Sequence, residues 1–436
     1  MPSDKKYSLL ELDLNKKSSK VFLSFINYLD CMKQRARDLT HMLFEQENQM
    51  LEQLILWCHI NSGSTHLSGL ALMHETLRHA FTPFADIIES HALPSIKTID
   101  LSGSSINQNF GELLFIRKRP HLTRRILLSG HMDTVYNERH PLQMVTQLDK
   151  NTLNGPGVAD MKGGIIVMLH ALLAFEQFPA AATLGIDVVI NADEELGSPA
   201  SRIFLESIVK NYQAAFVYEP STTPEGIFAK NRKGSGKLSV IATGKSSHAG
   251  RAFDEGRNAI CYLAEAILAI HALNGIREGV TLNIGQIAGG EALNIVPDHA
   301  IAKLDVRITT PEDEQWVRQQ LEKIFLQLKR PDYYLKLVGD FERPVKRVNW
   351  STTELFLRIQ QLGKTLGLNL DWQDSGGCCD GNNLAQHGLA VIDTLGVRGG
   401  AIHSINEFML IDSLVERTAL STLLLLDLAE GGLETL

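Results

Sequence analysis

Apolar residues follow two spacings along most of this chain. Short continuous apolar runs alternate with longer stretches in which apolar positions recur at helical spacing. Continuous runs are typical of strands buried on both faces, and their alternation with helices indicates a largely parallel sheet. The pattern predicts strands at residues 126–129, 185–190, 215–218 and 390–395, and helices at residues 163–175, 201–209, 353–366 and 411–428.

The N-terminal part is predicted to be mostly helical. Residues 1–35 are interpreted as an extension with one helix at 21–29, and the sequence assigns this extension no function. A longer amphipathic stretch follows at residues 39–55, and another helix is expected at residues 70–81.

Residues 233–341 show a different order of strands and helices, which predicts an inserted domain. Strands at 237–243, 280–287, 300–308 and 334–338 are combined with helices at 258–273 and after Thr310. Thr310 is expected to cap the second helix, with Pro311 as its first residue. The order βαββαβ is that of a ferredoxin-like unit. We therefore expect an α/β fold in which residues 36–232 and 342–436 form one discontinuous domain with a mostly parallel central sheet.

Length and composition agree with a soluble enzyme of more than one domain. The chain has 436 residues, 44% hydrophobic and 21% charged, with a net charge of −8. No basic run of the kind that binds nucleic acid occurs. The N-terminus lacks the apolar core of a secretory signal, and the apolar run at 423–426 is too short to span a membrane. The five cysteines form no pattern, so we expect reduced thiols and a cytoplasmic location.

Several acidic or histidine residues directly follow predicted strands. His131 ends one strand, Glu194 and Glu195 follow the next, and Glu219 follows another, while Asp160 precedes a helix. Open α/β sheets bind ligands beyond the carboxyl ends of their strands, so these side chains are expected to share one crevice. Carboxylate and imidazole ligands suit zinc, and two ions about 3.5–4 Å apart can share one carboxylate.

Five separated segments, in this order, resemble the M20 family of metallopeptidases, which includes glutamate carboxypeptidase, acetylornithine deacetylase, succinyl-diaminopimelate desuccinylase and aminoacylase. The segments are Ser129-Gly-His131-Met-Asp133, the run around Asp160, Asp193-Glu194-Glu195, Glu219-Pro220 and Gly399-Gly-Ala-Ile-His403. The resemblance extends from about Leu54 to the C-terminus. It implies a zinc-exopeptidase-like domain and an inserted domain that serves as a lid and as the surface of a homodimer.

The resemblance also implies two divalent metal ions in each subunit. Asp160 would bridge them, with His131 and Glu219 completing one site and Glu195 and His403 the other. Zinc is expected, and cobalt or manganese would accept the same ligands. A single-metal enzyme with the second site vacant remains an alternative.

Two further carboxylates are expected to act beside the metal ligands. Glu194 matches the family's general acid/base, and Asp133 matches the carboxylate that orients His131. Neighbouring side chains on an extended segment point apart, so a turn at residues 191–197 must bring Glu194 and Glu195 to the same site.

The expected substrate contacts come mainly from the inserted domain. By the same resemblance, His248 stabilises the oxyanion, commonly across a dimer, while Asn294 and Arg307 hold the substrate carboxylate. Gly376 and Gly377 belong to a substrate loop, which departs from the family pattern at Cys378-Cys379. Arg307 also admits a plainer interpretation, as a strand residue paired with an acid.

Other chemistries fit the sequence less well. The glycines of residues 155–164 do not have Walker spacing, and adjacent cysteines do not form a thiolate zinc site. Neither a His-Glu-x-x-His helix nor a Gly-x-Ser-x-Gly elbow occurs. The leading hypothesis is a metallo-carboxypeptidase that hydrolyses an amide next to a free carboxylate. The alternatives are an N-acyl amino acid deacylase and a non-catalytic, metal-loaded binding protein.

Overall fold

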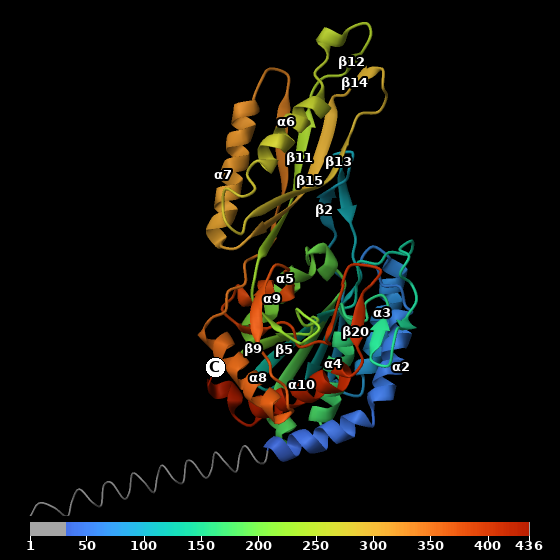
Figure 1. Cartoon of the computed structure of the whole chain (residues 1–436), viewed down its shortest axis with the longest axis vertical. Helices are drawn as coiled ribbons and strands as arrows, with labels where there is room; N and C mark the ends of the chain where they lie inside the picture. Colours follow the sequence, from blue (N-terminus) through green and yellow to red (C-terminus); the bar gives the residue numbers. More distant parts are fainter. Residues whose placement is uncertain (1–31, 436) are drawn as a thin grey trace, which may run out of the picture.

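The computed structural model describes residues 32–435, which form a larger domain and an inserted domain that extends away from it (Figure 1). The predicted helix at residues 21–29 lies outside the described residues. Residues 32–44 are helical, and their buried Met32, Ala36 and Leu39 pack on the core of the larger domain.

A six-stranded sheet runs through the larger domain in the order β1-β4-β8-β5-β9-β18. The strands, in that order, are Ile87–His91, Leu113–Lys118, Gly185–Asn191, Arg125–His131, Ala214–Val217 and Ala390–Ile392. The last four are parallel neighbours, whereas β1 and β4 are antiparallel. Every residue of β5 and β8 is buried, which explains their continuous apolar sequences.

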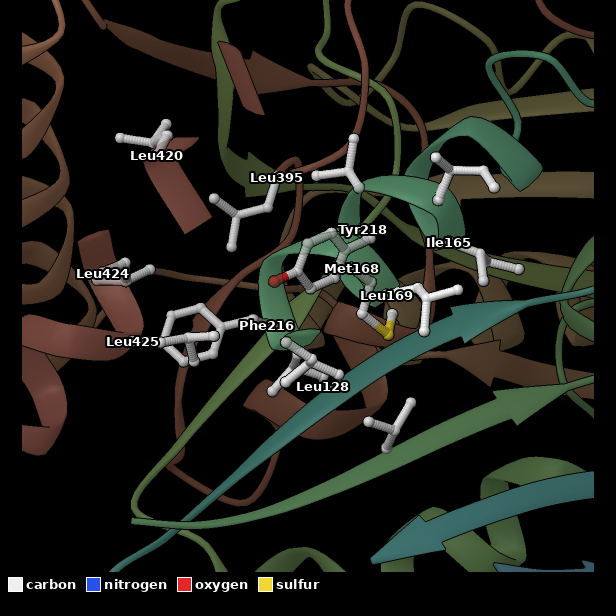
Figure 2. Close-up of a cluster of buried hydrophobic side chains, with 14 of the residues drawn as sticks. Leu128, Ile165, Met168, Leu169, Phe216, Tyr218, Leu395, Leu420, Leu424 and Leu425 are labelled. Carbon is white, nitrogen blue, oxygen red and sulfur yellow. The ribbon is translucent and has the colours of Figure 1, made fainter. Parts of the chain in front are cut away.

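Helices cover both faces of this sheet. One face packs against α2 (Glu47–Cys58), α3 (Leu67–Phe81), α4 (Lys162–Phe175), α8 (Trp350–Thr365) and α10 (Ser413–Ala429). The other face packs against α5 (Ser201–Ile208) and α9 (Asp380–Ala385). Figure 2 shows the first core, where Leu128 and Phe216 of the sheet meet Met168 of α4 and Leu424 of α10. This packing fixes the sheet edge at which the strands end.

The inserted domain has the antiparallel order β13-β15-β11-β16 expected of a ferredoxin-like unit. Its elements are β11 (Gly234–Thr243), β12 (Ser247–His248), α6 (Ala259–His271), β13 (Thr281–Gly289), β14 (Ile295–Val296), β15 (His299–Ile308), α7 (Pro311–Leu328) and β16 (Tyr334–Arg343). Asp313 stabilises the start of α7, because its Oδ2 accepts a hydrogen bond of 2.8 Å from the backbone N–H of Thr310. We propose that the inserted domain extends to Arg343, two residues beyond the predicted limit.

The structure differs from the predicted elements in three places. The expected helix at 39–55 is broken by a turn at Glu45 and Gln46, which no glycine or proline marks. Strands β1 and β4 were not expected, because they lack clear alternation and lie outside the βα repeats. A hairpin formed by β2 (Ile96–Ile99) and β3 (Ser105–Gln108) also reaches the inserted domain, where Gly103 lies close to His299.

The apolar run at residues 423–426 lies inside α10 and is buried in the core. Within residues 32–435, no helix combines the length and the apolar character needed to cross a membrane.

We expect the core between the sheet and α10 to dominate the stability of the larger domain. Leu424→Ala should lower the free energy of unfolding by about 2–5 kcal/mol, because it leaves a cavity among buried side chains. Leu56→Ala on α2 is the matched control, since Leu56 is 68% exposed and its truncation should change stability little. Denaturant unfolding followed by circular dichroism checks both, and equal losses would contradict the assigned core.

Candidate metal centre

The five side chains predicted to bind metal lie at one edge of the larger domain, beyond the carboxyl ends of the parallel strands. His131 is the last residue of β5, Glu195 lies in a 3-10 turn after β8, and Glu219 lies two residues after β9. Asp160 lies two residues before α4, and His403 lies between β19 (Gly399–Gly400) and β20 (Phe408–Leu410). Residues from both halves of the discontinuous domain therefore meet here.

Asp160 lies between the two histidines. Its Oδ1 is 3.1 Å from Nε2 of His131, and its Oδ2 is 3.2 Å from Nε2 of His403. Each histidine also faces one glutamate: His131 Nε2 is 3.7 Å from Glu219 Oε1, and His403 Nε2 is 3.1 Å from Glu195 Oε2. The arrangement is two histidine–glutamate pairs that share one carboxylate.

The donor atoms are close enough together to surround metal ions. One atom from each of His131, Asp160 and Glu195 lies within 4.8 Å of the others, and the same holds for His131, Glu194 and Glu219. Oε1 of Glu195 is buried, and among the described residues it has no hydrogen-bond partner. A buried carboxylate oxygen of this kind, beside other carboxylates, fits a cation ligand.

The buried carboxylates of this cluster affect one another's pKa. Burial, followed by the Asp160 carboxylate, raises the pKa of Glu195 to about 8. The same two causes raise the pKa of Glu219 well above its ordinary value. Burial acts in the same direction on Asp160, but hydrogen bonds with His131 and His403 hold its pKa well below the ordinary value. A divalent cation would compensate the negative charge that these buried carboxylates otherwise cannot carry together.

Asp133 holds the turn that carries the paired glutamates. Its Oδ1 and Oδ2 each accept a hydrogen bond of 3.2 Å, from the backbone N–H groups of Glu194 and Glu195 respectively. Oδ1 also lies 3.4 Å from Nδ1 of His131, although that nitrogen is closer, at 2.9 Å, to the Asp133 carbonyl. The hydroxyl of Ser64 donates to Oδ2 at 2.7 Å. Asp133 thus links His131 to the turn after β8.

The expected turn is a 3-10 helix, Glu194–Leu196, which ends at Gly197 with φ +98°. The turn directs both glutamates to the site: Glu195 meets His403, whereas Oε1 of Glu194 lies 2.5 Å from Nη2 of Arg343. Burial raises the pKa of Glu194, and the positive charge of Arg343 opposes part of that shift.

Comparisons with known proteins match this chain to peptidases. The family model described as "Peptidase dimerisation domain" matches residues 231–332, and "Peptidase family M28" matches residues 115–252. Carboxypeptidase G2 of Pseudomonas sp. (strain RS-16) is 29% identical over 313 residues, which are 71% of this chain and 75% of that protein. The chain belongs to the M20 family of metallopeptidases. Members of this family are hydrolases that use divalent metal ions.

Solved structures support the M20 fold. An M20 family metallo-carboxypeptidase of Sulfolobus solfataricus superimposes with a TM-score of 0.69 at 16% identity, covering 87% of this chain and 99% of that one. A tripeptidase of Staphylococcus aureus superimposes with a TM-score of 0.68 at 22% identity, covering 88% and 99%. At these identities the likeness concerns the fold alone.

A cleft of about 690 Å³ lies over the candidate metal centre of this M20 protein, between the two domains. Of the expected substrate-binding residues, Arg307, Gly376 and Gly377 line it. His248 and Asn294 do not: both are exposed at the tip of the inserted domain, near β12 and β14 and far from the cleft (Figure 1). One chain therefore brings the metal-site residues together but leaves these two apart from them.

The contacts of Arg307 are compatible with both interpretations made from the sequence, a substrate-binding residue and a strand residue paired with an acid. Its Nε and Nη2 donate to the two carboxylate oxygens of Asp305, at 2.7 and 3.1 Å, as a paired strand residue would. Its Nη1 nevertheless lies in the cleft, 3.2 Å from Sγ of Cys378. The guanidinium is thus held by Asp305 while one end remains at the cleft.

Sequence reasoning missed Arg343 and Glu407. Glu407 is fully buried, and its Oε1 accepts hydrogen bonds of 3.0 and 3.1 Å from the backbone N–H groups of Ala159 and Asp160. Its Oε2 accepts one of 2.5 Å from the hydroxyl of Tyr136, which also donates to the carbonyl of Ser404. Glu407 therefore joins the loop of His403 to the loop of Asp160. Its position four residues after His403, in a glycine-containing loop, was the available signal.

We expect Glu407→Ala to weaken metal binding without unfolding the protein. Loss of the carboxylate frees the backbone N–H groups of Ala159 and Asp160, and such outer contacts typically contribute about 10- to 100-fold in metal affinity. Titration of the metal-free protein with zinc, followed by calorimetry, measures the change. Glu75→Gln, an exposed glutamate on α3, is the control. Unchanged affinity in Glu407→Ala would show that the two loops hold the site without it.

Proposed function

We propose that this protein is a two-metal exopeptidase that hydrolyses an amide bond next to a free carboxylate, as a glutamate carboxypeptidase does. One observation carries the proposal: Asp160 lies between two histidine–glutamate pairs, while the neighbouring Glu194 lies in the same cleft and pairs with an arginine instead. This arrangement leaves Glu194 outside the set of proposed metal ligands, so that its carboxylate can carry a proton.

The residues divide into two sites that fit zinc. His131, Asp160 and Glu219 would hold one ion, and Asp160, Glu195 and His403 the other. When bound, the ions polarise the amide carbonyl and make a water molecule more acidic. Cobalt and manganese accept the same nitrogen and oxygen donors, so metal identity is part of the test.

Glu194 is assigned the proton transfer. Arg343 holds its Oε1, so Oε2 is the oxygen that would take the proton of the attacking water and pass it to the leaving nitrogen. The amide C–N bond breaks, a carboxylate forms on the acyl side, and the amine leaves with the transferred proton. Asp133 supports this step by holding the backbone of Glu194.

Substrate orientation is assigned to the side of the cleft formed by the inserted domain. Arg307 would bind the substrate carboxylate next to the scissile amide. Gly376 and Gly377, which have no side chains, would leave space in the cleft for the rest of the substrate. A Cβ at Gly376 would meet no atom within 4 Å, which is consistent with open space there. The similarity to carboxypeptidase G2 favours a peptidase over a deacylase.

His248 and Asn294 would reach a cleft only in a second copy of the chain. Both fall within residues 231–332, which match the dimerisation domain, and both are far from the cleft of their own chain (Figure 1). We therefore propose a homodimer in which the tip of each inserted domain completes the partner's site.

We expect Glu194→Ala to lose nearly all turnover while the protein keeps two metal ions per chain. Loss of a general acid/base typically costs about 10²- to 10⁴-fold in rate. Turnover is measured on a panel of dipeptides, acyl-glutamates and other N-acyl amino acids, with metal content determined by mass spectrometry. An active variant would contradict the role of Glu194, and one metal per chain with full activity would contradict the two-ion site.

The same panel of substrates tests the class of enzyme. Exclusive turnover of N-acyl amino acids would replace the peptidase by a deacylase. Inactivity of the fully metallated wild-type protein on the whole panel would favour a binding protein.

We expect Arg307→Met to raise KM by about 10- to 100-fold with a smaller change in kcat. A hydrogen bond to a charged group contributes about 1.5–3 kcal/mol, and the contact is made in both the ground and the transition state. Arg318→Met on α7 is the control, because Arg318 pairs with Glu314 outside the cleft. An unchanged KM in Arg307→Met would leave Arg307 as a strand residue paired with Asp305.

A further inference from the structure

Arg343, the last residue of β16, is buried directly beside Glu194. Its side chain is 2% exposed, and its Nη2 donates to Oε1 of Glu194 at 2.5 Å and to the Glu194 carbonyl at 3.2 Å. The guanidinium therefore holds this glutamate by both its carboxylate and its backbone. No ligand role explains the contact, because arginine does not bind metal ions.

The guanidinium is itself fixed on its other side. Nη1 donates to Oδ1 of Asp380 at 2.6 Å, and Nη2 also reaches the hydroxyl of Ser198 at 3.0 Å. Asp380 is held in turn by Ser198 and by Asn191, each at 2.6 Å. Because the planar fork bridges two buried carboxylates, rotation of Arg343 would break several charge-assisted bonds at once.

Arg343 also marks the point where the inserted domain joins the larger one. It pairs with Ser235 at the start of β11, and a Cβ at Gly234 would lie only 2.9 Å from the Arg343 carbonyl oxygen. On β11, Nζ of Lys237 donates to the carbonyl of Leu196 at 2.7 Å. Both strands that connect the domains thus contact the turn Glu194–Leu196.

Glu194 needs such support more than its neighbours do. The proposed ligands would be positioned by metal ions, whereas a glutamate that binds no metal keeps its side-chain rotations unless the protein removes them. Misplacement of a reacting group by about 1 Å can cost about 10²-fold in rate. We propose that Arg343 is a positioning residue that fixes the carboxylate of Glu194 and ties it to the base of the inserted domain. This inference rests on the proposed function, in which Glu194 carries the proton.

The test compares Arg343→Lys, Arg343→Gln, Glu194→Ala and the double variant Glu194→Ala/Arg343→Gln. We expect kcat to fall about 100-fold in Arg343→Gln and less in Arg343→Lys, which keeps the positive charge on a single nitrogen, with KM within about threefold of the wild type. The double variant should be no more than about threefold slower than Glu194→Ala alone, because both changes remove the same function. Arg318→Gln, which removes a lid-surface arginine from an ion pair with Glu314, should leave both constants unchanged.

Three results would overturn the inference while the proposed function stands. A rise in KM with kcat retained would make Arg343 a substrate-binding residue. Additive losses in the double variant would show that it acts independently of Glu194. Loss of the thermal unfolding transition in both single variants of Arg343 would make its role structural. An active Glu194→Ala, by contrast, removes the proposed function itself.

Discussion

The site depends on one shared carboxylate, Asp160, which lies between His131 and His403. These histidines come from opposite sides of the inserted domain in sequence, so the pair can form only when both halves of the larger domain have folded onto one sheet. The parallel strands make this possible, because their carboxyl ends meet at one edge. Glu407 adds the local link by accepting hydrogen bonds from the backbone N–H groups of Ala159 and Asp160 and from the hydroxyl of Tyr136.

Holding several carboxylates together out of water costs free energy, and the protein meets that cost with fixed partners. Asp133 receives two backbone N–H groups and a serine hydroxyl, and Glu407 receives two N–H groups and a tyrosine hydroxyl. Glu195 and Glu219 lack comparable support, and burial raises the pKa of both, as it also raises the pKa of Glu407 to about 7. The carboxylates with few protein donors are those assigned to metal ions, which is the distribution expected of a site completed by cations.

Sequence reasoning located the parts whose constraints are local. The continuous apolar runs predicted β5 and β8, and the βαββαβ order with its capped second helix predicted the inserted domain. His131 and the acids next to predicted strands and helices gave the expected crevice, because strand ends share an edge, whereas His403 came from the family resemblance. Arg343 could not be found this way, since its partners Glu194 and Asp380 are 149 and 37 residues away. The break after residue 44 and the distance of His248 from the cleft likewise depend on tertiary packing.

The cleft is mostly acidic on the side of the larger domain and mostly basic on the side of the inserted domain, although Arg232 of the larger domain and Glu342 of the inserted domain also line it. The larger domain supplies the carboxylates of Asp160, Glu194, Glu195 and Glu219, whereas β11, β15 and β16 of the inserted domain supply Lys237, Arg307 and Arg343. Arg343 is held by Glu194 and Asp380, and Lys237 by the Leu196 carbonyl, while one end of Arg307 faces the cleft. In the proposed function, Arg307 would bind the substrate carboxylate, and the neighbouring amide would then lie on the acidic side of the cleft. Arg307 belongs to the inserted domain and Glu194 to the larger one, so the proposed orientation of the substrate and the proposed placement of the proton carrier both depend on the junction between the domains, where Arg343 binds Glu194.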